Sequence, residues 1–305
     1  MMAQRVRSPL TWIGGKYYSA SQIVAAFPAA SSYDTYVDLF GGAAHVLLHR
    51  PFEKRHAEVY NDINQDLVNF WMQCRDHGEE LEARCRSLPY SRALHYQYHH
   101  ELYHGEELDP LERAVRWFYI LRSTFNAFIG PVHHGWLASP GRVESVAYHT
   151  ALDLFEALQR RLRYVLIDCR DFAAVLRSHD NPRTLFYVDP PYIEKEDYYY
   201  QRGDGMAFGL HDHERLAVLL NDTSALVALS YYPHPLLDRL YPESKWRRLT
   251  WEAVKHSQRG PETRERATEM LLCNYPPSAP IIAPLSLWKE AYDDRQREGV
   301  LRVHS

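Results

Sequence analysis

The sequence predicts an α/β fold with a mostly parallel sheet, interrupted by an inserted helix-rich domain. Short apolar segments that end in Gly, Asn or Asp alternate with helical segments at both ends of the chain, which is the pattern of βαβ units. Between them the strand signal weakens and helical periodicity takes over. At 305 residues the chain is long enough for about two domains.

A βαβ unit opens the chain. Its expected elements are, in order, a strand at residues 33–40, a helix at 45–50, a strand at 56–60 and a helix at 65–75. The first strand runs into Gly41 and Gly42, and the second runs into Asn61 and Asp62. Such residues mark the ends of buried strands, and a strand–helix–strand unit implies parallel pairing.

The middle of the chain is expected to be helical. Residues 111–125 carry apolar side chains at helical spacing, whereas the Pro and Gly residues of 130–141 predict a loop or hairpin. We therefore expect one domain to be built from residues 1–75 and 161–305, with residues 76–160 inserted as a second, helix-rich domain.

Strands return in the last part of the chain. The expected elements are a strand at residues 164–169, a helix at 171–178, a strand at 184–188, a helix at 211–221, and strands at 225–230 and 269–273. Residues 193–209 have no periodicity and predict a long loop beside the sheet. Residues 245–266 are rich in Lys and Arg and predict a basic loop around Gly260 and Pro261.

Composition excludes several classes of protein. The net charge is −4 with His neutral, so a nucleic-acid partner would require a local basic face. The four cysteines are scattered without a C-x-x-C pair, which is typical of reduced thiols and gives no cysteine-rich metal cluster. No apolar run reaches the length of a membrane helix and no signal peptide is evident, so we expect a cytoplasmic protein with no membrane partner.

The most informative motif follows the strand at residues 184–188. It consists of Asp189, Pro190, Pro191 and Tyr192. The two prolines lack N–H groups and fix a rigid turn, so neighbouring carbonyl groups can face a ligand. Asp189 offers an acceptor for an amino group and Tyr192 offers a flat face. Together they fit a planar base with an exocyclic amino group, and the alternative is a polar turn at the end of a strand.

Acidic residues fall at or just after the ends of several expected strands. They are Asp38, Asp62, Asp171 and Asp189. Ligands of open α/β sheets bind outside the carboxyl ends of the strands, and Asp62 is placed to accept hydrogen bonds from a ribose diol. Gly41 and Gly42 let the backbone approach a ligand closely. These residues predict a pocket for a nucleoside-containing ligand.

Several segments resemble, in order, the motifs of Dam-type DNA adenine-N6 methyltransferases. They are residues 9–16 (PLTWIGGK), 38–44 (DLFGGAA), 60–64 (YNDIN), 171–172 (DF), 189–192 and 269–275, which match the family's E-x-L-x-x-N-Y ending. The resemblance spans about residues 8–277. One departure is Ala44, which stands where the family often has a second Gly in F-x-G-x-G.

The resemblance implies a Rossmann-like methyltransferase fold in which residues 76–160 form a target-recognition domain. It implies S-adenosylmethionine as methyl donor and double-stranded DNA as partner, with no metal. The donor-binding residues that it implies are Trp12, Lys16, Asp38, Phe40, Gly41, Gly42, Asp62, Asp171, Phe172 and Asp189. Trp12 and Lys16 would border the amino-acid end of the donor, and Asp171 and Phe172 would hold its adenine.

The resemblance also implies a catalytic role for Asp189, Pro190, Pro191 and Tyr192. The target adenine must leave the duplex stack, because its amino group is otherwise paired and buried. Tyr192 would stack on the flipped base, while Asp189 and the Pro190 carbonyl would accept hydrogen bonds from its amino group. This arrangement directs the nitrogen lone pair at the methyl group by positioning and electrostatics.

DNA contacts are expected in two places. The expected residues are Arg122, Asn126, Lys255, Arg259 and Arg264. Residues 121–127 resemble the family's N-R-x-x-F/Y-N-G segment, with Leu121 for Asn and Ala127 for Gly, and base readout depends on such individual side chains. The basic segment at residues 245–266 fits phosphate contacts, although an ordinary surface loop has the same composition.

Other interpretations remain. Residues 100–104 are a literal H-E-x-x-H match, which on a helix is a zinc-peptidase pattern. Their polar surroundings, and Glu107 where the extended motif requires Gly, favour a solvated helix face. The same fold also serves RNA or cytosine-N4 methylation, or a non-catalytic DNA-binding protein. Asp189 at the first position of an intact motif favours adenine.

Overall fold

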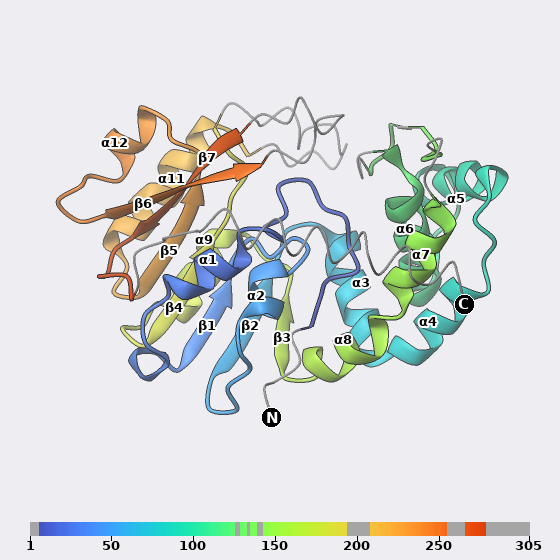
Figure 1. The fold of residues 1–305 in the computed structure, drawn as a ribbon, viewed down its shortest axis with the longest axis horizontal. Helices are drawn as coiled ribbons and strands as arrows, with labels where there is room; N and C mark the ends of the chain where they lie inside the picture. Colours follow the sequence, from blue (N-terminus) through green and yellow to red (C-terminus); the bar gives the residue numbers. More distant parts are fainter. Residues whose placement is uncertain are drawn as a thin grey trace, which may run out of the picture.

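A seven-stranded sheet forms the centre of the computed structural model, in the order β3-β2-β1-β4-β5-β7-β6 (Figure 1). The structure describes residues 6–125, 129–132, 135–138, 143–193, 208–254 and 266–278. The strands are β1 (Thr35–Asp38), β2 (Ala57–Asn61), β3 (Val165–Asp168), β4 (Thr184–Val188), β5 (Leu226–Tyr231), β6 (Arg247–Val254) and β7 (Arg266–Cys273). The first five strands pair in parallel, and β7 runs antiparallel to both β5 and β6. The predicted α/β fold with a mostly parallel sheet is confirmed.

Helices cover both faces of the sheet, which explains why β4 is apolar along its whole length. On one face lie α1 (Ala20–Ala25), α2 (His45–His49) and α3 (Gln65–Asp76), and on the other lie α9 (Phe172–His179), α11 (Leu210–Asp222) and α12 (Leu236–Leu240). Leu185 and Tyr187 pack on the first side, and Phe186 and Val188 on the second. The strand order reverses beside β1, so a crevice opens at the carboxyl ends of β1, β2 and β4.

A helical layer extends the molecule beyond β3 (Figure 1). It contains α4 (Gly78–Arg86), α5 (Arg92–His104), α6 (Pro110–Ser123), α7 (Glu144–Leu152) and α8 (Phe155–Leu162). Asp109 caps α6 by accepting hydrogen bonds from two backbone N–H groups, and Pro110 occupies the first turn, where its missing donor costs nothing. The helical interpretation of the middle of the chain is therefore confirmed.

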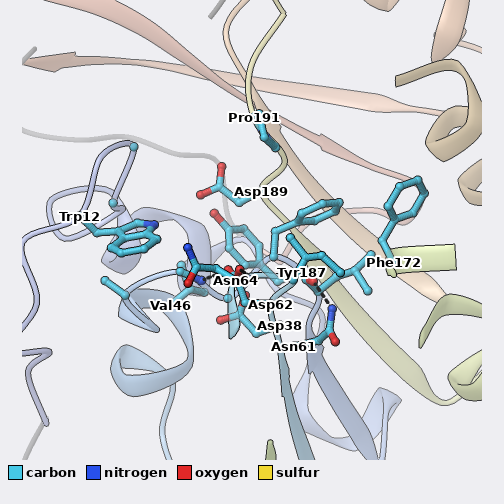
Figure 2. Close-up of a pocket in the computed structure, with 18 of the residues that line it drawn as sticks. Trp12, Asp38, Val46, Asn61, Asp62, Asn64, Phe172, Tyr187, Asp189 and Pro191 are labelled. Atoms are coloured by element: carbon cyan, nitrogen blue, oxygen red, sulfur yellow. Dashed lines mark hydrogen bonds between the residues drawn. The ribbon is translucent and has the colours of Figure 1, made fainter. Parts of the chain in front are cut away.

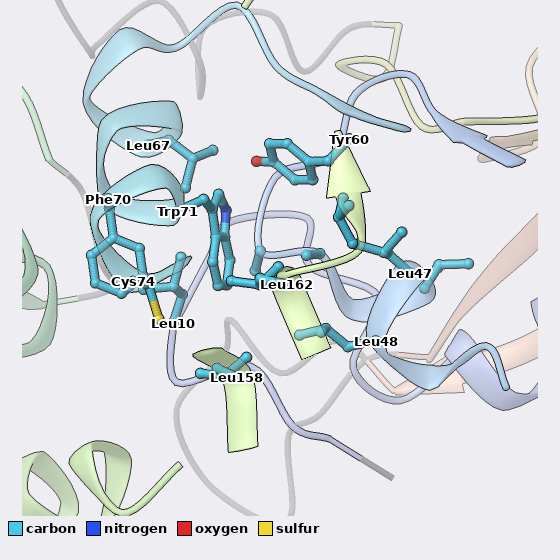
Figure 3. Packing of buried hydrophobic residues seen from close by; sticks show 14 of the residues in the cluster. Leu10, Leu47, Leu48, Tyr60, Leu67, Phe70, Trp71, Cys74, Leu158 and Leu162 are labelled. Carbon is cyan, nitrogen blue, oxygen red and sulfur yellow. The ribbon is translucent and has the colours of Figure 1, made fainter. Parts of the chain in front are cut away.

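One buried apolar cluster joins the sheet to the helical layer (Figure 3). Leu47 on α2 and Tyr60 on β2 belong to the same cluster as Phe70 and Trp71 on α3 and Phe118 on α6. Helix α8 crosses the expected domain boundary at residue 160. The boundaries at residues 75 and 160 stay predictions, since the core is continuous across both.

The first part of the basic segment at residues 245–266 is a strand and not a loop, whereas Gly260 and Pro261, around which the loop is expected, lie outside the described residues. Residues 247–254 form β6, which pairs with β7. Leu249 and Ala253 pack against the buried cluster and Trp251 is buried within it, in the alternation of a strand with one covered face. Arg247 and Arg248 at the start of the strand mask this alternation in the sequence. Within the ranges that the structure describes, none of the helices is both long and apolar enough to span a membrane.

A buried ion-pair network ties α8 to the sheet. Glu58 on β2 accepts hydrogen bonds from two Arg161 nitrogens, at 2.5 and 2.8 Å, and also pairs with Arg50. All three side chains are buried. The two buried cations offset the cost of burying the Glu58 carboxylate. If one of the three groups is removed, the groups that it pairs with lose a counter-charge, which destabilises the fold.

We expect Arg161→Met to lower the free energy of unfolding by about 3 kcal/mol, because Glu58 would lose one of its two buried counter-ions. The neighbouring Arg160 is exposed and pairs with Glu156 one helical turn away. Arg160→Ala should therefore cost less than about 0.5 kcal/mol. Urea denaturation of both variants measures the difference, and equal losses would contradict the role given to Arg161.

Candidate active site at the carboxyl edge of the sheet

A cavity of about 290 Å³ lies where β1, β2 and β4 end (Figure 2). All ten residues expected to bind the donor line it: Trp12, Lys16, Asp38, Phe40, Gly41, Gly42, Asp62, Asp171, Phe172 and Asp189. Trp12 and Phe172 lie on opposite sides of the cavity, with Asp38 and Asp62 between them (Figure 2). The fold thus brings these residues together from five separate segments of the chain, while their binding roles remain predictions.

The Gly-rich turn after β1 forms the floor of the cavity. A Cβ atom on Gly41 would lie 2.1 Å from the ring of Tyr60, and Gly42 has a φ of +49°. The Gly42 carbonyl accepts hydrogen bonds from the Tyr60 hydroxyl at 2.7 Å and the Trp71 indole at 3.1 Å. Ala44 adopts a φ of +56°. The departure from glycine there places an alanine in a left-handed conformation, at a cost of roughly 1 kcal/mol.

The turn after β2 is held by side-chain hydrogen bonds. Asp62 accepts from the N–H groups of Gly42 and Asn64, both at 2.9 Å. Asn61 donates to the carbonyls of Leu39 and Arg170, so it links the turns after β1 and β3. In the sequence, Asn61 is recognisable only as the residue at the end of a strand. Its hydrogen-bond partners lie on segments that come together only through the order of the strands in the sheet.

The cavity is acidic, and some of its charged side chains are buried. Burial raises the pKa of Asp38 well above its usual value, and the neighbouring charges of Asp189 and Asp62 raise it further. Burial also raises the pKa of Asp189, opposed by the Lys16 ammonium. Burial lowers the pKa of His45 to about 4, with Lys16 acting in the same direction. His45 is therefore neutral near pH 7, and the excess of carboxylates suits a cationic ligand.

Lys16 links the cavity to the Asp189–Tyr192 turn. Its Nζ lies 2.8 Å from Asp189 Oδ1, donates to the Gly14 carbonyl at 2.9 Å, and stands 4.8 Å from the centre of the Tyr192 ring. Pro191 lines the cavity, whereas Tyr192 is buried beside it. The sequence placed Lys16 only at the amino-acid end of the donor and gave no sign of its contact with Asp189.

Tyr192 is fixed by two further neighbours. Its hydroxyl donates to Glu269 Oε2 at 3.1 Å, and its ring packs edge-on against Tyr232 at 4.5 Å between centres. Glu269 appeared in the sequence only as the first residue of the family-like ending at residues 269–275. No local signal connected it to Tyr192, because β7 reaches that position through antiparallel pairing with β5.

An aromatic group closes the opposite end of the cavity. The rings of Phe40, Phe172 and Phe208 contact one another, with centres 5.6 to 5.8 Å apart. Arg215 on α11 stands 4.2 Å from the centre of the Phe172 ring and pairs with Asp171, which caps α9. Phe208 and Arg215 carry no signal in the sequence, since Phe208 lies within the aperiodic segment at residues 193–209 and Arg215 lies shortly after it.

The expected DNA contacts are only partly within the described structure. Arg122 donates to the carbonyls of Pro9 at 3.3 Å and Ala147 at 2.8 Å, so it joins α6 to α7 and to the segment before Trp12. The other expected residues lie outside the described residues: Asn126, Lys255, Arg259 and Arg264. Contact with DNA stays a prediction for all five.

The H-E-x-x-H match lies on α5. His100 and His104 have ring centres 5.7 Å apart, and Glu101 pairs with Arg116. The acid that would serve as the base of a peptidase is therefore part of an ion pair between helices. Across the described ranges, no group of three or more His, Cys, Asp or Glu side chains is placed to hold a metal ion.

Comparison with known proteins gives the family. A family model described as "D12 class N6 adenine-specific DNA methyltransferase" matches residues 12–255. A Haemophilus influenzae protein named DNA adenine methylase is 22% identical over 270 residues, covering 86% of this chain and 91% of its own. Type II methyltransferase M1.LlaDCHI of Lactococcus lactis subsp. cremoris is 25% identical over 284 residues, covering 87% and 94% respectively. The motifs, the fold and a match over most of the chain lead to one conclusion: this protein belongs to the D12 class of N6 adenine-specific DNA methyltransferases.

Proposed function

We propose that the protein transfers a methyl group from S-adenosylmethionine to N6 of an adenine flipped out of double-stranded DNA at a specific short sequence. One observation carries this proposal: the Asp189–Tyr192 turn borders the same acidic cavity as Trp12, Asp62 and Phe172. A group that recognises an amino-bearing base thus lies against a cavity suited to a nucleoside with a positive charge.

The residues around the cavity fit this donor. The backbone at Gly41 and Gly42 leaves no room for side chains, which suits close approach of a ligand. Phe40 and Phe172 offer aromatic faces to an adenine, and Asp62 offers a carboxylate to a ribose. When bound, S-adenosylmethionine supplies an electrophilic methyl group on a positively charged sulfur, and nearby carboxylates favour that charge.

The base side of the reaction falls to Asp189, Pro190 and Tyr192. The Asp189 carboxylate and the Pro190 carbonyl accept hydrogen bonds from the amino group, which keeps the nitrogen lone pair directed away from the ring. The face of Tyr192 holds the base plane. A base inside the duplex cannot reach these groups, so the target must leave the stack.

Asp189→Asn should reduce adenine methylation by at least about 100-fold, because the amide cannot replace a charged acceptor in a preorganised site. The test expresses the wild type and the variant in a host without adenine methylation and maps N6-methyladenine in its DNA by single-molecule sequencing. Wild-type marks at one short motif, and their loss in the variant, are expected.

A matched control is Asp34→Asn, which removes an exposed carboxylate just before β1, at the other edge of the sheet. This control should methylate like the wild type, and all three proteins should melt at similar temperatures. Full methylation by Asp189→Asn would refute its role. Marks on cytosine or on RNA, with none on adenine, would replace the proposed substrate.

Asp62→Ala should weaken S-adenosylmethionine binding by about 10- to 100-fold, the typical effect of losing hydrogen bonds to a charged group. The carboxylate both orders the Gly42 and Asn64 N–H groups and faces the cavity. Calorimetry measures donor affinity, and fluorescence anisotropy measures affinity for a duplex that contains the mapped motif. A larger loss for DNA than for donor would contradict the assignment of this pocket.

A further inference from the structure

Glu269 is a buried acid beside the proposed base-binding groups, and the reaction as described leaves it without a role. Its side chain is 8% exposed, and it accepts the Tyr192 hydroxyl at 3.1 Å. A buried carboxylate is costly unless it has a partner of opposite charge. A cation that acts on this carboxylate is the Lys16 ammonium, which lies on the face of the same ring.

Lys16 occupies the groups that the target base needs. Its ammonium pairs with Asp189 at 2.8 Å and covers the Tyr192 ring at 4.8 Å. An adenine that hydrogen-bonds to Asp189 and stacks on Tyr192 competes with this ammonium for both groups. Lys16 is 6% exposed, so its ammonium needs a counter-ion nearby once it has left Asp189.

Glu269 is a second carboxylate beside the same tyrosine. The hydroxyl end of the Tyr192 ring contacts Glu269 while Lys16 lies over its face, so both charged groups contact one side chain. The charge of Lys16 is the main influence that lowers the pKa of Glu269 against the effect of burial. Asp189 and Glu269 therefore both interact with the Lys16 ammonium, and the amino group of a base can take its place at Asp189.

We propose that Glu269 is a positioning residue that takes over the Lys16 ammonium when the target adenine occupies Asp189. This inference rests on the proposed function of the Asp189–Tyr192 turn. No covalent bond changes: the ammonium moves from one carboxylate to the other, Asp189 becomes available to the base, and the net charge of the site stays constant.

The test is the single-turnover rate of methylation of a duplex carrying the mapped motif, at saturating S-adenosylmethionine. Glu269→Gln should slow methylation by about 10- to 100-fold, because a neutral amide accepts a cation less well than a carboxylate. Its donor affinity, measured by calorimetry, should stay within about twofold of the wild type. Glu252→Gln is the matched control: this exposed glutamate on β6 bonds to Thr268, and its loss should leave the rate unchanged.

Two double variants distinguish a role of Glu269 in accepting the ammonium from a role in holding Tyr192 in place. In a Lys16→Met background no ammonium has to move, so adding Glu269→Gln should cost less than about threefold. In a Tyr192→Phe background the hydroxyl contact is absent but the ammonium remains, so adding Glu269→Gln should still cost at least about tenfold. The opposite pattern, with the effect lost in Tyr192→Phe and kept in Lys16→Met, would show that Glu269 only holds Tyr192 and would overturn the proposal.

The wild-type rate in the same assay tests the proposed function separately from the role of Glu269. If the wild type methylates adenine and Glu269→Gln matches it, only the role of Glu269 is refuted. If the wild type methylates no adenine while it still binds donor, the proposed function fails and the exchange at Asp189 fails with it.

Discussion

The burial of carboxylates at one edge of the sheet constrains the rest of the site, because it raises the pKa of both Asp38 and Asp189. Parallel pairing sends the carboxyl ends of β1, β2 and β4 to the same edge, and each strand leads into an acid: Asp38, Asp62 and Asp189. Each acid has a different compensation, namely a backbone N–H of Leu47, two backbone N–H groups, and the Lys16 ammonium. A cationic ligand would offset the cost of gathering these acids, whereas a neutral ligand of the same shape would not.

The hydrophobic core connects the Gly-rich turn after β1 to the rest of the molecule. The Gly42 carbonyl is fixed by Tyr60 on β2 and by Trp71 on α3, and Trp71 packs against Phe70 in the cluster that reaches α6 and α8. The floor of the cavity is thus anchored in the layer that joins the sheet to the helices. Preorganisation of this kind lets a site hold charge without rearranging at the moment of reaction.

Much of the fold could be predicted from the sequence, because several strands have local signals. The strand at residues 184–188 is apolar throughout and ends at two prolines, and the ten residues expected around the donor do meet at one cavity. Strand β6 escaped prediction because Arg247 and Arg248 outweighed the alternation of Leu249 and Trp251. The contact of Glu269 with Tyr192 could not be predicted, since it depends on the register of β7 against β5 and no neighbouring residue encodes that register.

Helix α6 is also a structural support for the donor cavity. Its Trp117 packs against Trp12, with ring centres 6.1 Å apart, and its Arg122 donates to the Pro9 carbonyl just before that tryptophan. Contacts from the helical layer therefore hold the amino-terminal motif in place. A chimera that exchanges residues 76–160 for those of a relative would replace the surface on which Trp12 rests. Such an exchange must carry the matching amino-terminal segment with it.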